Sequence, residues 1–234
     1  MIYSDFFSDK SKQRIAVLID PDKQTLQEST KKAAIINQIG ADMIFVGGSL
    51  VTNSVSQTVQ AIKSATDKPV ILFPGAISQF CTQADALILP CLISGRNPQY
   101  LIGSFVEAAG MIKKSGIETV STAYILIDGG KRTAVEYISN TTPLPADKPD
   151  LAAATAMAGE MLGMKAVYLE AGSGALNPVS KQIISTVKQS VDIPVIVGGG
   201  IKTAQQMQTA FDAGASVVVI GTAFENNNTF LNFF

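Results

Sequence analysis

The chain has 234 residues, of which 47% are hydrophobic, and its formal net charge is −1. It has no long basic run, which argues against a nucleic-acid partner, and no histidine, which removes the commonest general base and many zinc sites. No apolar run reaches the roughly 18 residues of a membrane span, and the polar N-terminus lacks the apolar core of a secretory signal. We therefore expect one cytoplasmic domain over residues 1–234, with carboxylates, Lys or Tyr doing any acid–base work.

Apolar, β-branched runs alternate with segments of helical composition along the whole chain. Continuous rather than alternating hydrophobicity is typical of parallel strands that are covered on both faces. The repeat predicts an α/β fold of the TIM (β/α)8-barrel type; a doubly wound open sheet is the alternative, but its G-x-G-x-x-G signature after the first strand is missing. The predicted strands are 15–20, 43–47, 70–74, 86–90, 122–128, 166–170, 195–198 and 217–221, and the predicted helices are 24–39, 54–65, 99–115, 151–162, 178–189 and 203–213.

Polar residues follow several of these strands, and a parallel barrel brings them to one face. Asp20 and Asp22 follow the first strand, Ser49 the second, Asp128 the fifth and Glu170 the sixth. The run Asp-Pro-Asp-Lys offers hard oxygen ligands beside a cation, as in sites where Mg²⁺ is shared with substrate phosphates. The alternative is a helix N-cap, since Asp and Pro are both favoured there.

The middle of the chain carries fewer signals. Cys81 and Cys91 lie in or near apolar segments, which favours two buried thiols over a disulfide or a zinc pair. Tyr100 is either a packing aromatic or a ligand contact. The connection 129–149 is the least regular part of the chain, and loops of this length are usually functional or mobile, so it could cover the site.

Three glycine-rich turns follow apolar runs in the last third of the chain, at 168–175, 197–201 and 220–223. Glycine lets backbone N–H groups approach an anion, and loops after strands seven and eight of a barrel commonly bind phosphate. Glu170 ends its apolar run beside the first turn, so we expect burial to raise its pKa toward that of a general base. The alternative is a structural carboxylate that accepts backbone N–H bonds. Tyr168 falls on the same side of the strand as Glu170.

Together the motifs LIDPDK, FVGGS, LFPG, YLEAGSGA, VGGGIK and VIGTA resemble those of the geranylgeranylglyceryl phosphate synthase family, which includes the heptaprenylglyceryl phosphate synthases. The resemblance runs from about Ile15 to Glu225. It implies a TIM barrel that transfers a prenyl group, expected from geranylgeranyl diphosphate, to the 3-hydroxyl of sn-glycerol 1-phosphate and releases diphosphate. It also implies Mg²⁺ as the cofactor.

The resemblance assigns roles to individual residues. Asp20 and Ser49 match the Mg²⁺ positions, Glu170 matches the base, and Tyr100 falls beside the prenyl groove, for which the region of Phe73, Leu89, Leu92, Leu101 and Ile102 is sufficiently apolar. The DDxxD motif of helical prenyl synthases is absent, so substrate oxygens would supply most of the metal's ligands. The positions that match the glycerol phosphate site are Tyr168, Leu169, Glu170, Ala171, Gly172, Ser173, Gly174, Gly199, Gly200, Gly221 and Thr222.

Two positions depart from the family pattern. Asp128 stands where relatives often have Asn, and Leu18 replaces a Lys that some members place two residues before the metal Asp. The candidates for the missing diphosphate contact are Lys23, Arg96, Lys131 and Arg132.

Two other functions fit a phosphate pocket: a phosphosugar isomerase or epimerase, and a barrel that binds a phosphorylated ligand without catalysis. The joint presence of Asp20 and Glu170 favours catalysis. We also expect a homo-oligomer, because apolar surface on a barrel's helices must be sparse or covered, and a lipid product allows a peripheral membrane contact.

Overall fold

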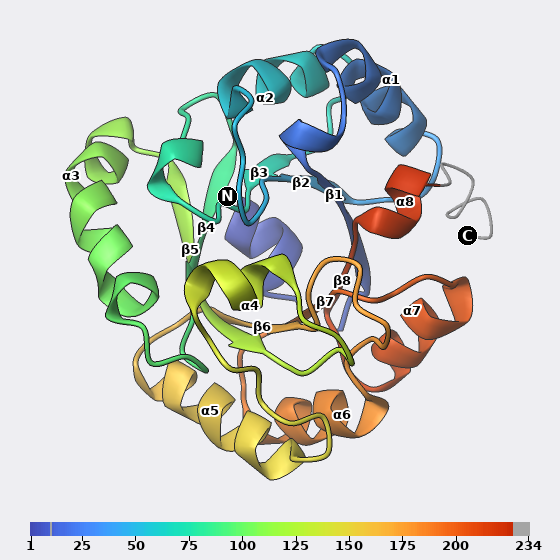
Figure 1. Ribbon diagram of the computed structural model, residues 1–234. Coiled ribbons are helices and arrows are strands. Elements are labelled where there is room, and N and C mark those ends of the chain that lie inside the picture. Colours follow the sequence, from blue (N-terminus) through green and yellow to red (C-terminus); the bar gives the residue numbers. More distant parts are fainter. Residues whose placement is uncertain (10, 227–234) are drawn as a thin grey trace.

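Eight parallel strands close into a barrel in chain order, and β8 pairs with β1 (Figure 1). The computed structural model describes residues 1–9 and 11–226; residue 10 and residues 227–234 of the expected domain lie outside the described residues. The predicted TIM barrel is confirmed. Its strands are β1 (Arg14–Ile19), β2 (Met43–Val46), β3 (Val70–Leu72), β4 (Ala86–Cys91), β5 (Glu118–Leu126), β6 (Ala166–Glu170), β7 (Val195–Gly198) and β8 (Val217–Ile220).

The strand expected over 122–128 differs most from the structure. It begins at Glu118, because the mixed polar and apolar run that starts there pairs with the whole of β4, and it ends at Leu126. Asp128 therefore lies beyond the strand, in a turn where its Oδ1 accepts the backbone N–H of Gly130 at 2.8 Å.

Most of the predicted helices are shorter in the structure, whereas the helix expected over 151–162 begins earlier, at Pro149. Capping residues set the first turn of several helices. Thr25 forms a capping box with Glu28, and Thr203 forms one with Gln206. The helices are α1 (Leu26–Ile36), α2 (Val55–Lys63), α3 (Ser104–Ser115), α4 (Ala134–Ser139), α5 (Pro149–Met161), α6 (Lys181–Ser190), α7 (Ala204–Asp212) and α8 (Thr222–Asn226), with the short turns η1 (Tyr3–Phe7), η2 (Pro21–Lys23), η3 (Ile77–Gln79) and η4 (Gln99–Gly103).

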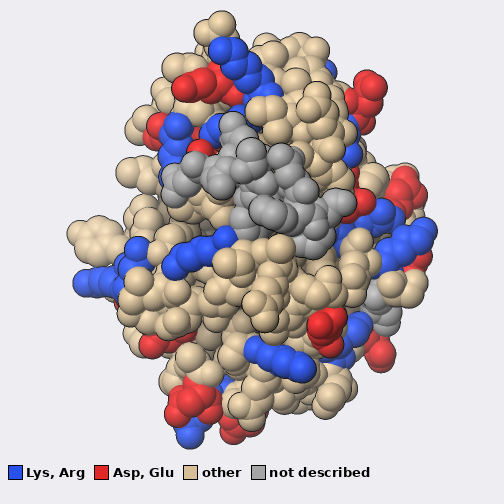
Figure 2. All heavy atoms as spheres, turned by 90° about the vertical axis from the view of Figure 1, so that its right-hand side faces the viewer, with Lys and Arg blue, Asp and Glu red and all other residues tan. Residues whose placement is uncertain are grey.

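The connection expected to be irregular, 129–149, contains α4, and Asn140 ends this helix in the left-handed conformation at φ 50°. The first five residues of the predicted helix 99–115 are π-helical, and α3 follows them. None of the helices that the structure describes combines the length and apolarity of a membrane span. Acidic and basic side chains are interspersed over the face on the side of α7 and α8 (Figure 2). Cys81 and Cys91 are free and buried, as expected.

The core has two layers, which follow from the alternation of side chains along each strand. Val167 and Leu169 of β6 point outward into the layer between strands and helices. Tyr168 and Glu170 point inward, and Tyr168 belongs to the cluster that fills the barrel. Figure 1 looks into the barrel and shows the N-terminal segment, with η1, at its far end, where Phe7 is fully buried in the same inner cluster.

Candidate active site

A cavity of about 590 Å³ lies at the carboxyl ends of the strands, the face where barrel enzymes keep their active sites. Its wall has a polar part made by the glycine turns after β6, β7 and β8, and an apolar part made by Phe73, which follows β3, and by side chains of β4, α3 and α4. Both parts meet at Glu170. The cavity is thus shaped for a ligand with an anionic end and an apolar end.

The three glycine turns meet on the polar part of this wall, as the sequence predicts. Gly174, Gly199 and Gly200 have φ values of 70°, 79° and 72°, a left-handed conformation that favours glycine. Ser173 and Thr222 bring two of the turns together, with their hydroxyl oxygens 3.4 Å apart. Gly221 lines the same wall.

Three residues of the first turn lie elsewhere. Leu169 and Ala171 point away from the cavity and are buried between barrel and helices, so the ligand contacts expected of them are not on its wall. Gly172 does not line the wall either; its N–H donates to Glu170 Oε1 at 2.6 Å, and Thr133 packs where a Cβ would stand. Period-two alternation already places Leu169 opposite Tyr168, whereas the partner of Gly172 depends on how the turn folds back.

Glu170 lies at the junction of the two parts of the cavity and is 6% exposed. Burial raises its pKa to about 7, against the opposing effects of hydrogen bonds from the N–H of Gly172 and the hydroxyl of Tyr168. Gly199 has to lack a side chain, because a Cβ there would lie 2.3 Å from Glu170 Oε1. Glu170 thus accepts a backbone N–H bond, as the structural interpretation predicts, and burial raises its pKa, as expected from the sequence.

Tyr168 forms the floor of the cavity together with two other rings. It stacks on Phe73, with ring centroids 4.9 Å apart and planes 10° apart, and Tyr124 packs against both at 5.3 and 5.8 Å. Burial, reinforced by the charge of Glu170, raises the pKa values of Tyr124 and Tyr168 well above the usual range. Both tyrosines therefore stay protonated at neutral pH, and the hydroxyl of Tyr168 donates to Glu170.

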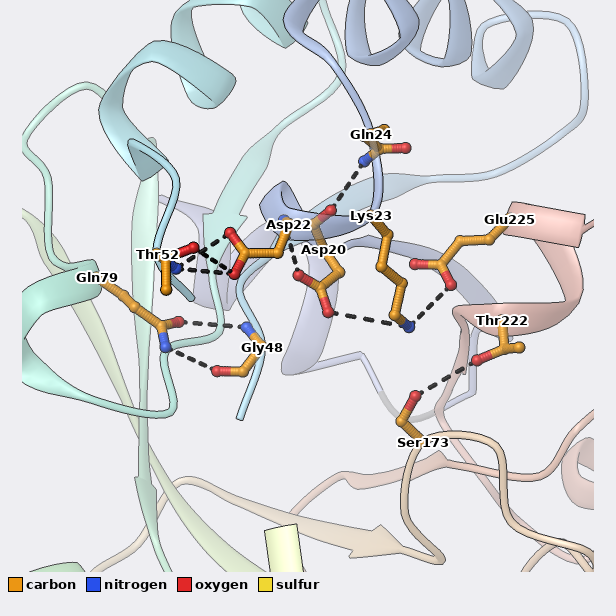
Figure 3. A network of polar contacts seen from close by, with 10 residues as sticks. All are labelled: Asp20, Asp22, Lys23, Gln24, Gly48, Thr52, Gln79, Ser173, Thr222 and Glu225. Carbon is orange, nitrogen blue, oxygen red and sulfur yellow. Dashed lines mark hydrogen bonds and ion pairs between the residues drawn. The ribbon is translucent and has the colours of Figure 1, made fainter. Parts of the chain in front are cut away.

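Asp20 lies at the end of β1 and does cap η2: its Oδ1 accepts the N–H of Asp22 at 3.1 Å (Figure 3). Its Oδ2 faces Gly48 and lies 3.9 Å from Lys23 Nζ, and Asp20 and Ser49 line the same cavity. Burial raises the pKa of Asp20. The cap and the candidate metal ligand thus use different oxygens of one carboxylate.

Asp22 has a structural role. Its carboxylate accepts the N–H groups of Thr52 and Asn53, at 2.9 and 2.8 Å, and the hydroxyl of Thr52 at 2.9 Å. These bonds lower the pKa of Asp22, and the residue does not line the cavity.

The sequence analysis does not single out two residues that lie on or beside the cavity, Gln79 and Lys202. Gln79 donates from Nε2 to the carbonyl of Gly48 at 2.7 Å and accepts the N–H groups of Gly48 and Gly75, each at 3.2 Å, so it fixes the turn that carries Ser49 (Figure 3). Lys202 lines the cavity after the second glycine turn and donates to the carbonyl of Leu176 at 3.1 Å. The motif VGGGIK contained the signal for Lys202, whereas nothing in its local sequence marks Gln79.

Of the four cations considered for diphosphate, Lys23 alone lines the cavity described here. Arg96 donates to the carbonyl of Gly95 at 2.7 Å, and Arg132 lies outside, 69% exposed and 3.7 Å from Glu136. Lys131 approaches Gly174 but is not part of the wall.

The apolar part of the cavity agrees in large measure with the predicted groove. Phe73, Leu89, Leu92 and Tyr100 line it, whereas Leu101 does not and Ile102 is 59% exposed. Part of the 129–149 connection lines the cavity through α4, a helix that the sequence pattern did not predict. The side chains that α3 and α4 add are Ser104, Phe105, Ala108, Ile112, Ala134, Val135, Ile138 and Ser139.

Comparison with known proteins shows close relatives. The model of the PcrB family matches residues 8–232. The geranylgeranylglyceryl phosphate synthase of Chitinophaga pinensis is 50% identical over 98% of this chain and 92% of its own length, and that of Flavobacterium johnsoniae is 49% identical over 93% and 90%. The crystal structure of (S)-3-O-geranylgeranylglyceryl phosphate synthase from Thermoplasma acidophilum, in complex with substrate sn-glycerol-1-phosphate, superposes with a TM-score of 0.90 at 34% identity, over 95% of this chain and 90% of that one.

Proposed function

The chain belongs to the PcrB family, and from this premise we propose that it is a prenyltransferase of the geranylgeranylglyceryl phosphate synthase type. It joins the prenyl group of a prenyl diphosphate to the 3-hydroxyl of sn-glycerol 1-phosphate and releases diphosphate. The observation that carries the proposal is the position of Glu170, a buried carboxylate with a pKa of about 7 between a glycine-lined anion pocket and an apolar cavity. A phosphosugar isomerase has no use for the apolar part.

Glycerol phosphate binds with its phosphate at the turns of Ser173–Gly174, Gly199–Gly200 and Gly221–Thr222. Left-handed glycines let several N–H groups converge on one anion, and the ammonium of Lys202 lies on the same wall. A phosphate held there leaves the glycerol hydroxyls directed toward Glu170. The relative from Thermoplasma acidophilum, which binds sn-glycerol-1-phosphate, supports this choice of acceptor.

Glu170 removes the proton of the attacking hydroxyl. Its Oε1 is held by the N–H of Gly172, and the hydroxyl of Tyr168 donates to the same carboxylate, so the base is oriented before substrate binds. With a pKa of about 7 the carboxylate is largely ionised at slightly alkaline pH and still basic enough to take a proton in the transition state. The aromatic floor and the apolar wall exclude water from the reacting carbon.

Mg²⁺ is the proposed cofactor, held by Asp20 Oδ2 and the hydroxyl of Ser49. Among the described residues, no group of three or more His, Cys, Asp or Glu side chains is arranged so that it could hold a metal ion by itself. One carboxylate and one hydroxyl fit a Mg²⁺ ion whose other ligands are water and substrate phosphates. When bound, the ion neutralises the charge that develops on the leaving diphosphate.

The test is incubation of the purified protein with radiolabelled sn-glycerol 1-phosphate, Mg²⁺ and prenyl diphosphates of several lengths. We expect an ether-linked prenylglyceryl phosphate, with geranylgeranyl diphosphate as a good donor, and no turnover in EDTA. Asp20→Asn should lose most of the activity while keeping its fold, because the charge serves the diphosphate. Absence of product with every donor would refute the transferase, and full activity in EDTA would refute the metal.

A homo-oligomer also remains part of the proposal. Met161 and Leu162, at the end of α5, are 84% and 75% exposed, and apolar side chains this exposed support a covered surface. Light scattering after size-exclusion chromatography measures the mass directly, and a value near 24.6 kDa, the mass of one chain, would contradict it.

A further inference from the structure

Lys23 lies between two carboxylates at the mouth of the cavity. Its Nζ is 2.9 Å from Glu225 Oε2 and 3.9 Å from Asp20 Oδ2 (Figure 3). The side chain of Lys23 is 42% exposed, whereas those of Glu225 and Asp20 are 10% and 18% exposed. The ammonium is therefore the accessible group of the three, and its close partner is Glu225 rather than the candidate metal ligand.

Glu225 comes from the other end of the chain. It lies on α8, whose Phe224 is fully buried and anchors the helix to the core. Thr222 precedes Glu225 by three residues and so falls on the same face of the helix, where it contacts Ser173 of the first glycine turn. One short helix thus connects the glycine turns with the carboxylate that holds Lys23.

The geometry matters because two carboxylates compete for one ammonium. If Glu225 were absent, Asp20 would be the carboxylate within reach of Lys23, and an ion pair between them would occupy the oxygen proposed for Mg²⁺. The shorter contact with Glu225 leaves Asp20 Oδ2 with only a long contact.

Among the described residues, Lys202 is the only cation besides Lys23 that lines the cavity. Leu18, at the position where some family members carry Lys, lines the cavity with an apolar side chain. Lys202, the other cation on the described wall, lies with the glycine turns and donates to the carbonyl of Leu176. A diphosphate that approaches Asp20 therefore meets Lys23 first.

We propose that Glu225 is a positioning residue, which holds the ammonium of Lys23 off Asp20 so that it binds the diphosphate of the prenyl donor. The identity of the donor rests on the proposed function. The binding of diphosphate itself does not, since inorganic pyrophosphate presents the same group. Simple electrostatics makes the opposite prediction for Glu225, because removing a carboxylate near an anion should strengthen anion binding.

The test is calorimetric titration of inorganic pyrophosphate into the full-length protein, with and without Mg²⁺. Lys23→Met should weaken binding about tenfold or more under both conditions, the usual effect of losing a charged hydrogen bond. Glu225→Ala should also weaken it, most strongly with Mg²⁺, because Lys23 then pairs with Asp20. Glu225→Gln keeps an acceptor for the ammonium and should lie between Glu225→Ala and the wild type. Lys63→Met is the matched control: it breaks an ion pair between Lys63, at the end of α2, and Asp85, away from the cavity, and pyrophosphate binding should stay unchanged.

Steady-state kinetics separates positioning from general damage. The KM for prenyl diphosphate should rise in Lys23→Met and Glu225→Ala, while the KM for sn-glycerol 1-phosphate stays near the wild-type value. Pyrophosphate binding that is unchanged in Lys23→Met, or as tight as wild type or tighter in Glu225→Ala, overturns the proposal. Wild-type protein that makes no ether but binds pyrophosphate through Lys23 would instead refute the proposed function and leave this inference intact.

Discussion

The two ends of the barrel are built on opposite principles. At the amino ends of the strands, η1 closes the barrel with Phe7, and charged groups have near partners: Arg14 lies 3.2 Å from Asp42, and Glu118 accepts the N–H groups of Ile2 and Tyr3 at 2.6 and 2.8 Å. At the carboxyl ends there is an open cavity.

The carboxyl end also contains features that oppose stability. Its glycine turns lose more backbone entropy on folding than turns of other residues would, and the carboxylate of Glu170 is buried against its preference for water. We infer that the residues at the amino end stabilise the fold, whereas the residues at the carboxyl end form the candidate active site and lower the stability of the fold. Substitutions at the two ends should therefore separate stability from activity.

We expect the largest difference between the effect on activity and the effect on stability for Glu170→Gln, at the carboxyl end. General-base assistance typically contributes about 10²–10⁴-fold, so kcat should fall by a factor in that range. The affinity for sn-glycerol 1-phosphate should stay close to wild type, since the phosphate binds at the glycine turns. Near wild-type kcat across pH would assign proton removal to water or diphosphate, and leave Glu170 as an orienting acceptor.

Phe7→Ala should give the opposite result at the amino end. Removing a fully buried Phe side chain costs about 3–5 kcal/mol of unfolding free energy, because the cavity left behind refills only in part. Activity below the new melting temperature should stay unchanged, since Phe7 belongs to the far end of the inner cluster. Urea unfolding and kcat/KM at 20–25 °C measure both quantities, and a loss of kcat without a loss of stability would contradict the division of roles.

Glu170 should also make the stability of the wild type depend on pH. Its carboxyl has a pKa of about 7 when folded against an ordinary value of 4.5, so the folded state binds the proton more tightly. Stability from this group is fully present below pH 4.5 and is lost as pH rises to about 7, by on the order of 3 kcal/mol.

Glu170→Gln removes this titration, so the variant should gain stability relative to wild type as pH rises from 5 to 8. Denaturant unfolding of both proteins at several pH values measures the difference, and other titrating groups cancel between them. A difference that stays constant with pH would mean that the carboxyl is not strained by burial.

We expect the smallest effect on binding and stability for Gly221→Ala. Gly200→Ala is compared with it because Gly200 needs its glycine for the backbone conformation as well. A Cβ at Gly221 meets nothing closer than Leu18 at 3.7 Å and only enters the phosphate pocket, so binding of glycerol phosphate should weaken about tenfold with little change in melting temperature. At Gly200, φ is 72° and a Cβ would lie 2.6 Å from the carbonyl oxygen of Asn177, so stability should fall as well. Equal melting temperatures for the two variants would contradict this distinction.

The sequence by itself determined the order of the strands in the barrel and the positions of the glycine turns. Each strand is a short apolar run, and each glycine turn directly follows one, so residues close together in the chain carry the signal. The same locality explains why Tyr168 and Glu170 could be placed on one side of β6, and why the eight strands could be found with modest errors at their ends.

The tertiary structure decided what depends on distant partners. The raised pKa of Glu170 comes from burial by surrounding elements, Gln79 holds the turn at Gly48 because its side chain reaches that turn, and α4 contributes side chains to the cavity wall. Lys23 and Glu225 are 202 residues apart in the chain, yet they form one ion pair. Burial and charge pairing are set by whatever the closed barrel brings together, and local periodicity carries no record of those neighbours.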